Sequence, residues 1–546
     1  MKNNLLLILV AASLYANTPK EPFKVIPKTI CENIYEKNLN DFARIDKKKF
    51  VVELYTNNCK KGRKFFWIDD NNKLKSNYLD LIGLSAQDEL YSNKAKNLIK
   101  TKTIALSKDS LQYKEIINLD IELTNIFIKT IYYQYYGNID FDDMKNAIRQ
   151  IKKKQDKKNK FEWDYLKKKV ELEKYIADAL NHDKILNGII NIQTNYIQHK
   201  KLKNSIKKYK KIQKMGIWRP IAYGKTIRYN TNDTRIPQIK KRLMHTDGLD
   251  LKQNLTPFYD KNFLKAVIQF QLRHGLKPDG NIGKTTIQKL NIPVADKIAQ
   301  INLNLERHRW LPLNFPNKYI EINIPSFKLR IIEDNTVSYA TKVVVGKYKR
   351  PTPVFKDRLS SFVINPYWRV PQSIIQRDFV DKMMLDSTYG QRKNIKITRD
   401  GVPVASTDIN WFEYDEDDNV PYEFTQAPGD NNALGRVKFL FPNRYAVYMH
   451  DTNHKSLFKR NTRAYSSGCI RIYKPFKLLD ILVEDDKRYT NKNIKEHLKS
   501  KQNRHFVFKN KLDIYINYLT VYVDDDGLTY FYPDIYGYDK LQQKWM

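Results

Sequence analysis

Cysteine, acidic residues and long hydrophobic runs are all scarce in this sequence. Only three cysteines occur in 546 residues. Past the N-terminus, no apolar run approaches the roughly 20 residues that a membrane-spanning helix needs, so no spanning helix is expected there. At the same time, 41% hydrophobic and 12% aromatic residues are too many for a disordered chain. The length then favours a globular protein of about two to four domains.

The shortage of acidic residues leaves the chain strongly basic. Lys and Arg number 97 against 60 Asp and Glu, which gives a formal net charge of +37. This balance favours anionic partners, with nucleic acid and an acidic cell-wall polymer as the candidates. The charge is concentrated in lysine-rich stretches such as 152–160 and 200–214. Runs of this kind are more often solvated helix faces than dedicated binding patches.

The first residues have the pattern of an export signal. Lys2 supplies positive charge, an apolar segment runs from Leu5 to Leu14, and Ala16 suits a cleavage site. We therefore expect residues 1–16 to be a signal peptide, with an uncleaved inner-membrane anchor as the alternative. Export of the mature protein argues against nucleic acid as the partner of its positive charge.

The three cysteines fall into a pair and a single residue. Cys31 and Cys59 are close in sequence, and in an oxidising compartment they could form a disulfide. Cys469 is then the odd thiol, far away in the chain and potentially reactive. The alternative is that all three are buried as small hydrophobic residues.

Residues 17–234 are predicted to be a mainly helical scaffold without a chemical motif. A stripe of apolar residues at helical spacing runs through 111–136; it comprises Ile116, Leu119, Leu123, Ile126 and Thr130. Short strands are expected near the segments FVVELYTNN (50–58) and KFFWIDD (64–70).

Residues 235–293 form a distinct unit in the sequence. The segment from Lys261 to Gly275 is predicted to be a helix with Gly275 as its stop; its apolar face comprises Phe263, Leu264, Val267 and Ile268. The turn cluster LKPDGNIG and a further helix, KTTIQKLN, follow. The whole phrase, with its helix centred on Gln269, closely resembles the small three-helix peptidoglycan-binding domain. The alternative is a helical bundle of the same pattern that binds no ligand. Residues 294–317 are predicted to be a single linking helix returning to the scaffold.

From residue 318 to 546 the pattern changes to strands. YIEINI alternates apolar and polar residues, and FKLRIIEDNTVSYATKVVVG indicates a hairpin with Glu-Asp-Asn at its tip. FVINPYWRVP, RYAVYMH and the C-terminal YINYLTVYVDDDGLTYFYPD are further strand candidates. A polar insert at about 372–430 is too long for a plain connection and predicts a lid or subdomain. The predicted fold class is α+β and multidomain.

One segment of this last region, 449–472, carries candidate catalytic residues. His450 follows the apolar run AVYM, and Cys469 follows Ser466, Ser467 and Gly468. A thiol is a nucleophile only as thiolate, and a neighbouring imidazole can promote that state. Gly468 permits a sharp turn, and backbone N–H groups there can stabilise an oxyanion. With Arg471 able to hold a carboxylate, the segment suits acyl transfer through a thioester.

His-Asp-Thr, thirteen further residues and then Ser-Ser-Gly-Cys-Ile-Arg closely resemble the signature of the YkuD-type L,D-transpeptidases. Together with the preceding regions, the chain resembles the large periplasmic branch of that family. The resemblance implies a mainly-β catalytic domain with an inserted lid, Cys469 as the nucleophile and His450 as the base. It further implies oxyanion-hole amides from Gly468 and Cys469. It also implies substrate contacts, which are assigned to Arg471, Tyr448, Ser467 and Trp368. Trp368 belongs to a strand-end phrase of the large branch that also includes Asn365, Pro366 and Pro371.

Two positions depart from the commonest pattern of the family. Asp451 stands where many smaller relatives have Gly, and Ser467 where many have His. They leave open whether a side chain or a backbone carbonyl orients the imidazole of His450. A metal site of His450, His454, Asp451 and Cys469 is the weaker interpretation, because the second shell that would orient such ligands is not evident. Trp368 and Arg471 could each be purely structural.

The resemblance implies a periplasmic enzyme that joins diaminopimelate residues of peptidoglycan stem peptides and releases D-alanine. No cofactor and no metal are implied, and the expected partners are stem peptides, the wall polymer and other cell-wall synthesis proteins, but no nucleic acid. An L,D-carboxypeptidase would use the same thioester and pass it to water. A wall-binding scaffold with an idle site is the alternative from another class.

Overall fold

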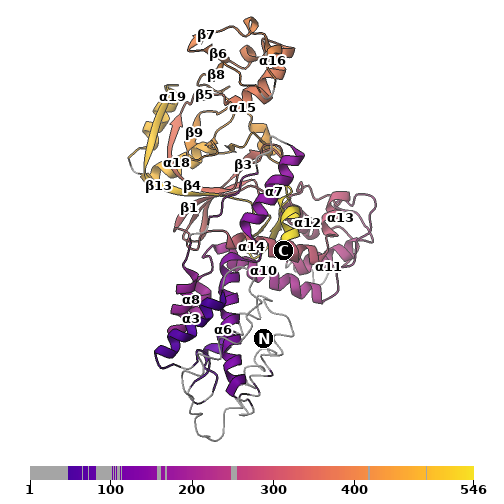
Figure 1. Cartoon of the computed structure of the whole chain (residues 1–546). Coiled ribbons are helices and arrows are strands. Elements are labelled where there is room, and N and C mark those ends of the chain that lie inside the picture. Colours follow the sequence, from indigo (N-terminus) through magenta and orange to yellow (C-terminus); the bar gives the residue numbers. More distant parts are fainter. Residues whose placement is uncertain are drawn as a thin grey trace. The chain divides into compact units, whose positions relative to one another are not determined.

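The computed structural model (Figure 1) describes most of the chain after residue 46. The described residues are 47–63, 65–69, 71, 73–81, 101, 104, 106, 111, 113–156, 161–166, 169–247, 255–415, 418–486 and 488–546. The predicted signal peptide, residues 1–16, therefore lies outside them. The chain divides into two compact units, 1–138 with 167–194 and 139–166 with 195–546, each of which is described separately.

The first unit is helical. Its helices are α3 (Lys47–Lys60), α6 (Tyr113–Tyr136), α8 (Leu172–Asn181) and α9 (Ile185–Asn191). The whole predicted stripe of α6, from Ile116 to Thr130, is buried. Within this core the carboxylate of Asp120 accepts the backbone N–H groups of Trp67 and Phe66 and the hydroxyl of Tyr55. These bonds hold α3 and the segment after it against α6.

The strand predicted at 50–58 is wrong, because this segment lies in helix α3. Its buried residues are Phe50, Val51, Leu54 and Tyr55, which share one face at helical spacing. Packing of that face against the core outweighs the strand preference of the β-branched and aromatic residues. The second segment, 64–70, contributes only an isolated bridge between Ile68 and Leu74.

Cys59, near the end of α3, is disulfide-bonded, whereas Cys469 is a free thiol. The expected partner of Cys59, Cys31, lies outside the described residues, so this pairing stays a prediction. Thiol counting on the unreduced, denatured protein tests it, and we expect one reactive thiol; a count of three would refute the disulfide.

The second unit begins with helices that surround the later sheet. They are α7 (Phe141–Gln155), α10 (Ile197–Lys214), α11 (Ile236–Asp247), α12 (Lys261–Arg273), α13 (Lys284–Leu290) and α14 (Val294–Arg309). Helices α11, α12 and α13 share one hydrophobic core, as the three-helix prediction requires. The linking helix predicted for 294–317 is α14, and it packs with α10 against the C-terminal hairpin.

The face that α12 buries differs from the predicted one. Phe263 and Val267 are buried as expected, but Leu264 and Ile268 are only half-buried. Gln271 is buried, whereas Gln269, on which the predicted helix is centred, is exposed. The side-chain amide of Gln271 closes the following turn, because its Oε1 accepts the N–H of Gly280 at 2.9 Å. A buried amide that satisfies a turn is not visible in apolar periodicity.

The catalytic region folds into a sheet that closes on itself. Its strands are β1 (Lys318–Asn323), β2 (Lys328–Glu333), β3 (Thr336–Gly346), β4 (Phe355–Ile364), β9 (Val437–Leu440), β10 (Met449–His450), β11 (Ala464–Ser466), β12 (Ile470–Ile472) and β13 (Arg504–Asn517). The order is β11-β3-β12-β10-β9-β4-β13-β1-β2, and β2 also pairs with β3. The predicted hairpin is β2–β3, and Asp334 and Asn335 at its tip both have positive φ, as a tight hairpin turn requires.

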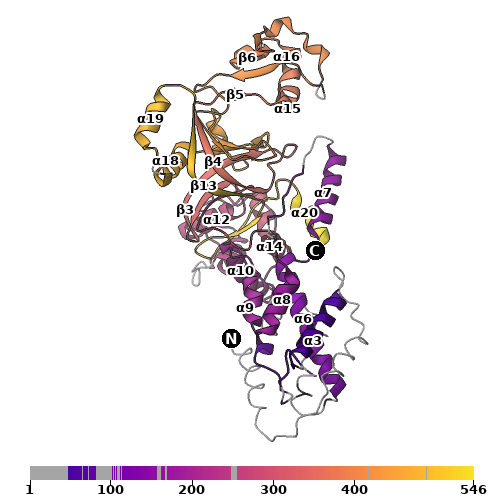
Figure 2. The same cartoon turned by 60° about the vertical axis from the view of Figure 1, so that its left-hand side comes forward.

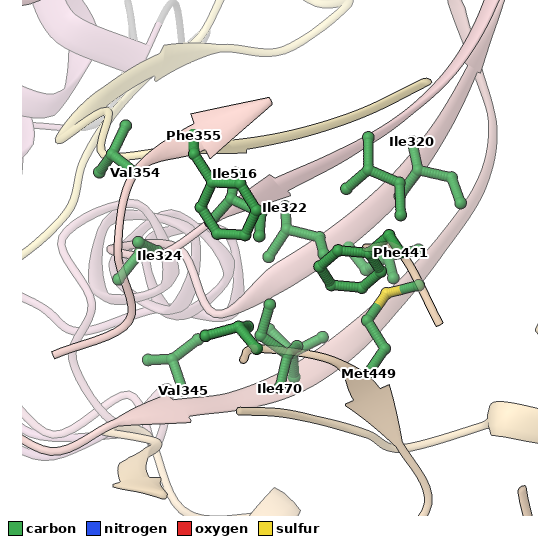
Figure 3. Packing of buried hydrophobic residues seen from close by; sticks show 14 of the residues in the cluster. Ile320, Ile322, Ile324, Val345, Val354, Phe355, Phe441, Met449, Ile470 and Ile516 are labelled. Atoms are coloured by element: carbon green, nitrogen blue, oxygen red, sulfur yellow. The ribbon is translucent and has the colours of Figure 1, made fainter. Parts of the chain in front are cut away.

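The interior of this sheet is filled with aliphatic and aromatic side chains (Figure 3). Ile320, Ile322 and Ile324 point inward from β1 and its end. Met449 of β10 and Ile470 of β12 join them, and both are fully buried. Because side chains alternate along a strand, the neighbours of Met449 and Ile470 must face the outer side of the sheet. This alternation places the catalytic candidates.

The insert folds as a small subdomain with its own core. It comprises β5 (Trp368–Arg369), α15 (Gln372–Ile374), a π-helical turn η1 (Ile375–Val380), α16 (Asp381–Leu385), α17 (Tyr389–Arg392), β6 (Ile395–Arg399), β7 (Val402–Pro403), the turns η2 (Ser406–Asp408) and η3 (Trp411–Glu413), and β8 (Glu423–Gln426). Its sheet has the order β5-β8-β6-β7 and pairs with no strand of the main sheet. Residues 368–426 are called the insert subdomain below.

The chain ends in helices and a hairpin around the main sheet. These elements are the turn η4 (Lys455–Lys459), α18 (Pro475–Asp486), α19 (Asn491–Lys499), β14 (Val521–Val523), β15 (Thr529–Phe531), α20 (Tyr538–Gln542) and the turn η5 (Gln543–Trp545). Helices α18 and α19 lie beside β13 and β4 (Figure 2). The paired C-terminal strands expected from the sequence are β14 and β15. Within the described residues, no helix has both the length and the apolar character needed to span a membrane.

Candidate active site

The catalytic candidates lie together on the outer face of the main sheet. Strand β10 runs parallel to β12, with His450 opposite Arg471 and Met449 opposite Ile470. Because Met449 and Ile470 face the core, His450 and Arg471 face outward. Cys469 directly precedes Ile470, the first residue of β12, so the predicted nucleophile lies at the start of the strand that pairs with the strand of the predicted base; paired strands are about 4.8 Å apart.

A backbone carbonyl orients the imidazole of His450. The Nδ1 atom lies 2.5 Å from the carbonyl oxygen of Asp451. A carbonyl oxygen only accepts hydrogen bonds, so Nδ1 carries the proton and Nε2 is the nitrogen that can take one. Burial, together with the positive charges of Arg471 and Lys438, lowers the pKa of His450 to about 3, although the bond to Asp451 opposes this shift. The base is therefore a neutral imidazole at physiological pH.

The side chain of Asp451 has a structural role, which accounts for the departure at this position. Its carboxylate accepts the N–H of Arg436 at 3.0 Å and forms an ion pair with Lys455. A Cβ atom at Gly435 would meet the same carboxylate at 2.3 Å, and φ at Gly435 is +60°. Only a glycine at 435 therefore lets the Asp451 carboxylate hold the segment entering β9.

The thiol of Cys469 is surrounded by polar groups of β9, β12 and the loop before β10. Burial raises the pKa of the thiol, whereas the N–H and hydroxyl of Tyr448, the ammonium of Lys438 and the guanidinium of Arg471 lower it. The sulfur lies 3.9 Å from the carbonyl oxygen of Ala446. The thiol and the imidazole are thus both neutral at rest, and cations are placed to stabilise negative charge on the sulfur.

Ala446 is held in a strained conformation by one asparagine. Its φ of +53° is rare for a residue with a side chain and costs about 1 kcal/mol. The amide of Asn443 fixes this loop, because Oδ1 accepts the N–H groups of Tyr445 and Val447 and Nδ2 donates to the carbonyl of Phe441. The predicted strand AVYM (446–449) is therefore a loop up to Tyr448, held by the hydrogen bonds of Asn443. Only Met449 and His450 form a strand.

The turn bearing the nucleophile rests on the loop between β3 and β4. Thr352 Oγ1 donates to the carbonyl of Gly468 at 2.8 Å and accepts the N–H of Gly346 at 2.8 Å. The hydroxyl of Tyr536 donates to the carbonyl of Gly346, and buried Lys152 of α7 donates to the carbonyl of Tyr536 at 2.7 Å. A helix from the region predicted as scaffold thus supports the catalytic turn.

The two predicted oxyanion-hole amides differ in their present contacts. Gly468 has a φ of +118°, which favours glycine, and its N–H donates to Ser466 Oγ at 3.2 Å. Ser466 Oγ also donates to the carbonyl of Cys469. An oxyanion would have to share the Gly468 N–H with Ser466, so the role of both amides stays a prediction.

A cavity of about 740 Å³ opens between the main sheet and the insert subdomain. Val363, Lys438, Ala446 and Tyr448 line one wall, and the other wall includes Trp368, Arg369, Glu423 and Thr425 from β5 and β8. Tyr448 and Trp368 thus line the cavity, as predicted for substrate contacts. Trp368 also packs against the insert's own core, so it has a structural role as well.

Ser467 and Arg471 have other surroundings. Ser467 is exposed, is absent from the cavity wall and accepts a hydrogen bond from Arg350 at 2.9 Å. Arg350 in turn forms a bidentate pair with Asp378 of the insert subdomain, at 2.5 and 3.1 Å. The Nε atom of Arg471 is buried without a hydrogen-bond partner. A buried donor of this kind is available to a substrate group.

Lys438 is a further residue of the site that was not among the predicted ones. In the β9–β10 register this residue is opposite His450, while Phe439 and Met449 face the core, so Lys438 shares the outer face with the catalytic candidates. Its ammonium lies 3.8 Å from the centre of the Tyr448 ring. Alternation along β9, a short Val-Lys-Phe-Leu strand, marks Lys438 as outward-facing, but only the strand order places it beside His450.

Among the described residues, no three His, Cys, Asp or Glu side chains gather as they would around a metal ion. His454 Nδ1 contacts the side chain of Asn453, and Asp451 is engaged by Lys455.

Three parts of the chain match known family models. Residues 317–489 match the family model for the YkuD L,D-transpeptidase catalytic domain, and residues 50–206 match a scaffold domain. Residues 232–290 match the model described as "Putative peptidoglycan binding domain". A Haemophilus influenzae protein named "Putative L,D-transpeptidase" is 34% identical over 289 residues. That alignment covers 51% of this chain, and the chain spans only 58% of the relative's length.

Two solved structures also show likeness. An L,D-transpeptidase from Xylanimonas cellulosilytica matches with 12% identity and a TM-score of 0.16, covering 54% of this chain and 99% of that one. The Ldtfm-avibactam carbamoyl enzyme matches with 11% identity and a TM-score of 0.17, covering 41% of this chain and 64% of that one. These scores are too low to support any inference. The family matches do support one: residues 317–489 are similar to the L,D-transpeptidase catalytic domain of the YkuD family, and the chain also has regions similar to a scaffold domain and to a peptidoglycan-binding domain.

Proposed function

We propose that the protein crosslinks peptidoglycan stem peptides through a thioester on Cys469. The observation that carries this proposal is the placement of Cys469 directly before β12, the strand that pairs with the strand of His450, with Nδ1 of the imidazole bonded to the Asp451 carbonyl. That arrangement leaves Nε2 as the proton acceptor, and Lys438 and Tyr448, which neighbour His450, line a cavity of about 740 Å³, within the size range of ligand sites.

In the first step, Cys469 Sγ attacks the carbonyl carbon of the peptide bond that precedes the terminal D-alanine of a tetrapeptide stem. The thiol proton passes to His450 Nε2, and Lys438 and Arg471 offset the negative charge that develops. The carbon–nitrogen bond then breaks, and His450 returns the proton to the departing amine of D-alanine. The neutral resting state of His450 favours rapid return of this proton.

In the second step, the side-chain amine of diaminopimelate on another stem attacks the thioester. Its proton passes to His450, the carbon–sulfur bond breaks, and the thiol is restored. Water competes for the same thioester, so a transferase must bind the amine close to the sulfur and keep water away. The insert subdomain forms one wall of the cavity and suits the role of a lid.

An L,D-carboxypeptidase is the second candidate, because hydrolysis would use the same residues up to the thioester. Incubation of the purified protein with disaccharide tetrapeptides, followed by mass analysis, separates the two. We expect crosslinked dimer and free D-alanine. Tripeptide as the sole product, even at high acceptor concentration, would favour the carboxypeptidase. Absence of any D-alanine release would contradict both.

The proposed partners are stem peptides and the wall polymer, which the peptidoglycan-binding domain suits. Both wall-directed domains favour a location in contact with peptidoglycan, and we propose the periplasm. The signal peptide at 1–16 is part of this proposal. Mass measurement of the mature protein from the producing cell would test it, because cleavage after Ala16 removes those residues.

A further inference from the structure

Three outward-facing residues form one row across three neighbouring strands. Lys438 of β9 is opposite His450 of β10, and His450 is opposite Arg471 of β12. The base is thus flanked by a cation on each side. Cys469 lies one residue before Arg471, so both cations are close to the reacting sulfur, and each affects the pKa of the thiol.

Two cations near the site, Arg350 and Lys455, have carboxylate partners, whereas Lys438 and Arg471 have no such partner among the described residues. Arg350 pairs with Asp378, and Lys455 pairs with Asp451. Across the part of the chain that the structure describes, no carboxylate lies within ion-pair distance of Lys438, which contacts only the face of the Tyr448 ring. A half-buried cation without a counter-ion is costly, and burial lowers the pKa of Lys438 accordingly.

The two cations, Lys438 and Arg471, also differ in their access to the cavity. Lys438 lines the cavity of about 740 Å³, whereas Arg471 does not. A bound peptide therefore has room to bring an anionic group to Lys438. We propose that Lys438 binds the α-carboxylate of the D-amino acid on the amine side of the reacting bond. This inference rests on the proposed function and specifies one of its substrate contacts.

The chemistry of the two half-reactions explains why one cation can serve both. The departing D-alanine carries its amine and its carboxylate on the same carbon. The accepting amine of diaminopimelate is likewise attached to a carbon that bears a carboxylate. The incoming amine must occupy the place that the departing amine left, because attack on the thioester reverses the geometry of its formation. A fixed ammonium beside that place binds both groups in the same orientation.

The test compares two donor substrates in four forms of the full-length protein. The substrates are a disaccharide tetrapeptide with a free C-terminal carboxylate and the same compound with a C-terminal carboxamide. The proteins are the wild type, Lys438→Met, Lys438→Arg and the control Lys459→Met, which removes an exposed lysine from the same catalytic region. The readout is kcat/KM for release of D-alanine or D-alaninamide.

We expect the wild type and Lys459→Met to prefer the carboxylate by about tenfold or more, the scale of a hydrogen bond to a charged group. Lys438→Met should lose most of that preference, and Lys438→Arg should keep part of it. Equal losses on both substrates, or an unchanged preference, would overturn the inference while leaving the proposed function intact. Failure of the wild type to release either product would overturn both.

A second measurement separates substrate binding from activation of the thiol. Alkylation of Cys469 by neutral iodoacetamide, followed against pH, reports the ionisation of the thiol without any carboxylate. Because the ammonium of Lys438 lowers the pKa of the thiol, Lys438→Met should move the profile to somewhat higher pH, and the inference requires that the carboxylate preference is lost at the same time. A shift of the profile to higher pH by a full unit, with the carboxylate preference retained, would assign Lys438 to the thiol and contradict the inference.

Discussion

The main sheet and the insert subdomain form the two walls of one cavity, and they are built differently. The main sheet is closed and filled with aliphatic and aromatic side chains, and its strand register brings His450 next to the strand that Cys469 precedes. The insert subdomain has short strands, a separate core and a π-helical turn. Its sheet has no strand paired with the main sheet.

This difference suggests a division of labour between the walls. A closed, well-packed sheet holds reacting groups within a fraction of an ångström, as acid–base and nucleophilic chemistry require. A subdomain joined by fewer contacts can open to admit a second peptide and then exclude water. We infer that the main sheet determines whether a thioester forms, and that the insert subdomain determines which acceptor takes it.

The sharpest test of the main sheet's role is Cys469→Ala. We expect complete loss of D-alanine release and crosslinking, because no other free thiol occurs among the described residues. Circular dichroism and thermal unfolding should match the wild type, since Cys469 is only half-buried. Retained turnover in this variant would disprove the thioester mechanism.

His450→Ala should have the next largest effect. Loss of a general base and acid costs at least about 100-fold in kcat/KM. A matched control is His454→Ala. His454 is four residues away, and its imidazole contacts the side chain of Asn453. Equal rates for the two variants would show that His450 is not the base.

The buried imidazole of His450 also predicts how stability depends on pH. Its pKa is lowered to about 3 in the folded protein, against about 6.5 when unfolded. As pH falls below about 6.5, the unfolded state takes up a proton that the folded state does not, so stability is lost until about pH 3. Between pH 7 and pH 4 the loss from this residue is roughly 3 kcal/mol.

Urea unfolding of wild type and His450→Gln at the two pH values measures that contribution. Other buried histidines, His274 and His308, also have lowered pKa values, so both proteins should lose stability in acid. The wild type should lose more, by roughly 3 kcal/mol. An equal loss would mean that His450 is accessible to protons in the folded state.

Much of the architecture could be predicted from local sequence pattern. The β2–β3 hairpin was predictable because alternation and an Asp-Asn turn agree. The motif around Cys469 was predictable because nucleophile, glycine and arginine are close in sequence. Helix α3 was not, because its β-branched residues favour strand locally and only burial of one face makes them helical.

The parts of the site that sequence could not supply depend on tertiary register. Lys438 reaches His450 only because β9 is the neighbour of β10, a pairing that no local pattern specifies. The group that orients His450 is a backbone carbonyl. Every residue has one, so the sequence does not indicate which carbonyl takes this role. The strained backbone of Ala446 is held by Asn443. The side chain of Asn443 makes four hydrogen bonds with the backbone of this loop, and these exist only once the loop has folded.

The smallest predicted effect concerns the contact between the two walls. Arg350 donates to Asp378 of the insert subdomain and to Ser467, two residues before the nucleophile. This residue therefore couples the position of the insert to the catalytic turn. Arg350→Met and Asp378→Asn should each lower the ratio of crosslinked dimer to hydrolysed tripeptide by about fivefold, with thioester formation less affected, because contacting charged pairs couple by about 1 kcal/mol.

The double variant decides whether the pair acts as one unit. If the ion pair is the coupling element, the double variant should resemble either single variant, because the second substitution removes nothing further. Additive losses would mean that the two residues act independently.

Thioester formation, measured as the first turnover of D-alanine, is the control, since the main sheet alone should set it. A parallel fall in first turnover and crosslinking would mean that Arg350 serves the catalytic turn rather than the insert, and that the two walls are not separate in function.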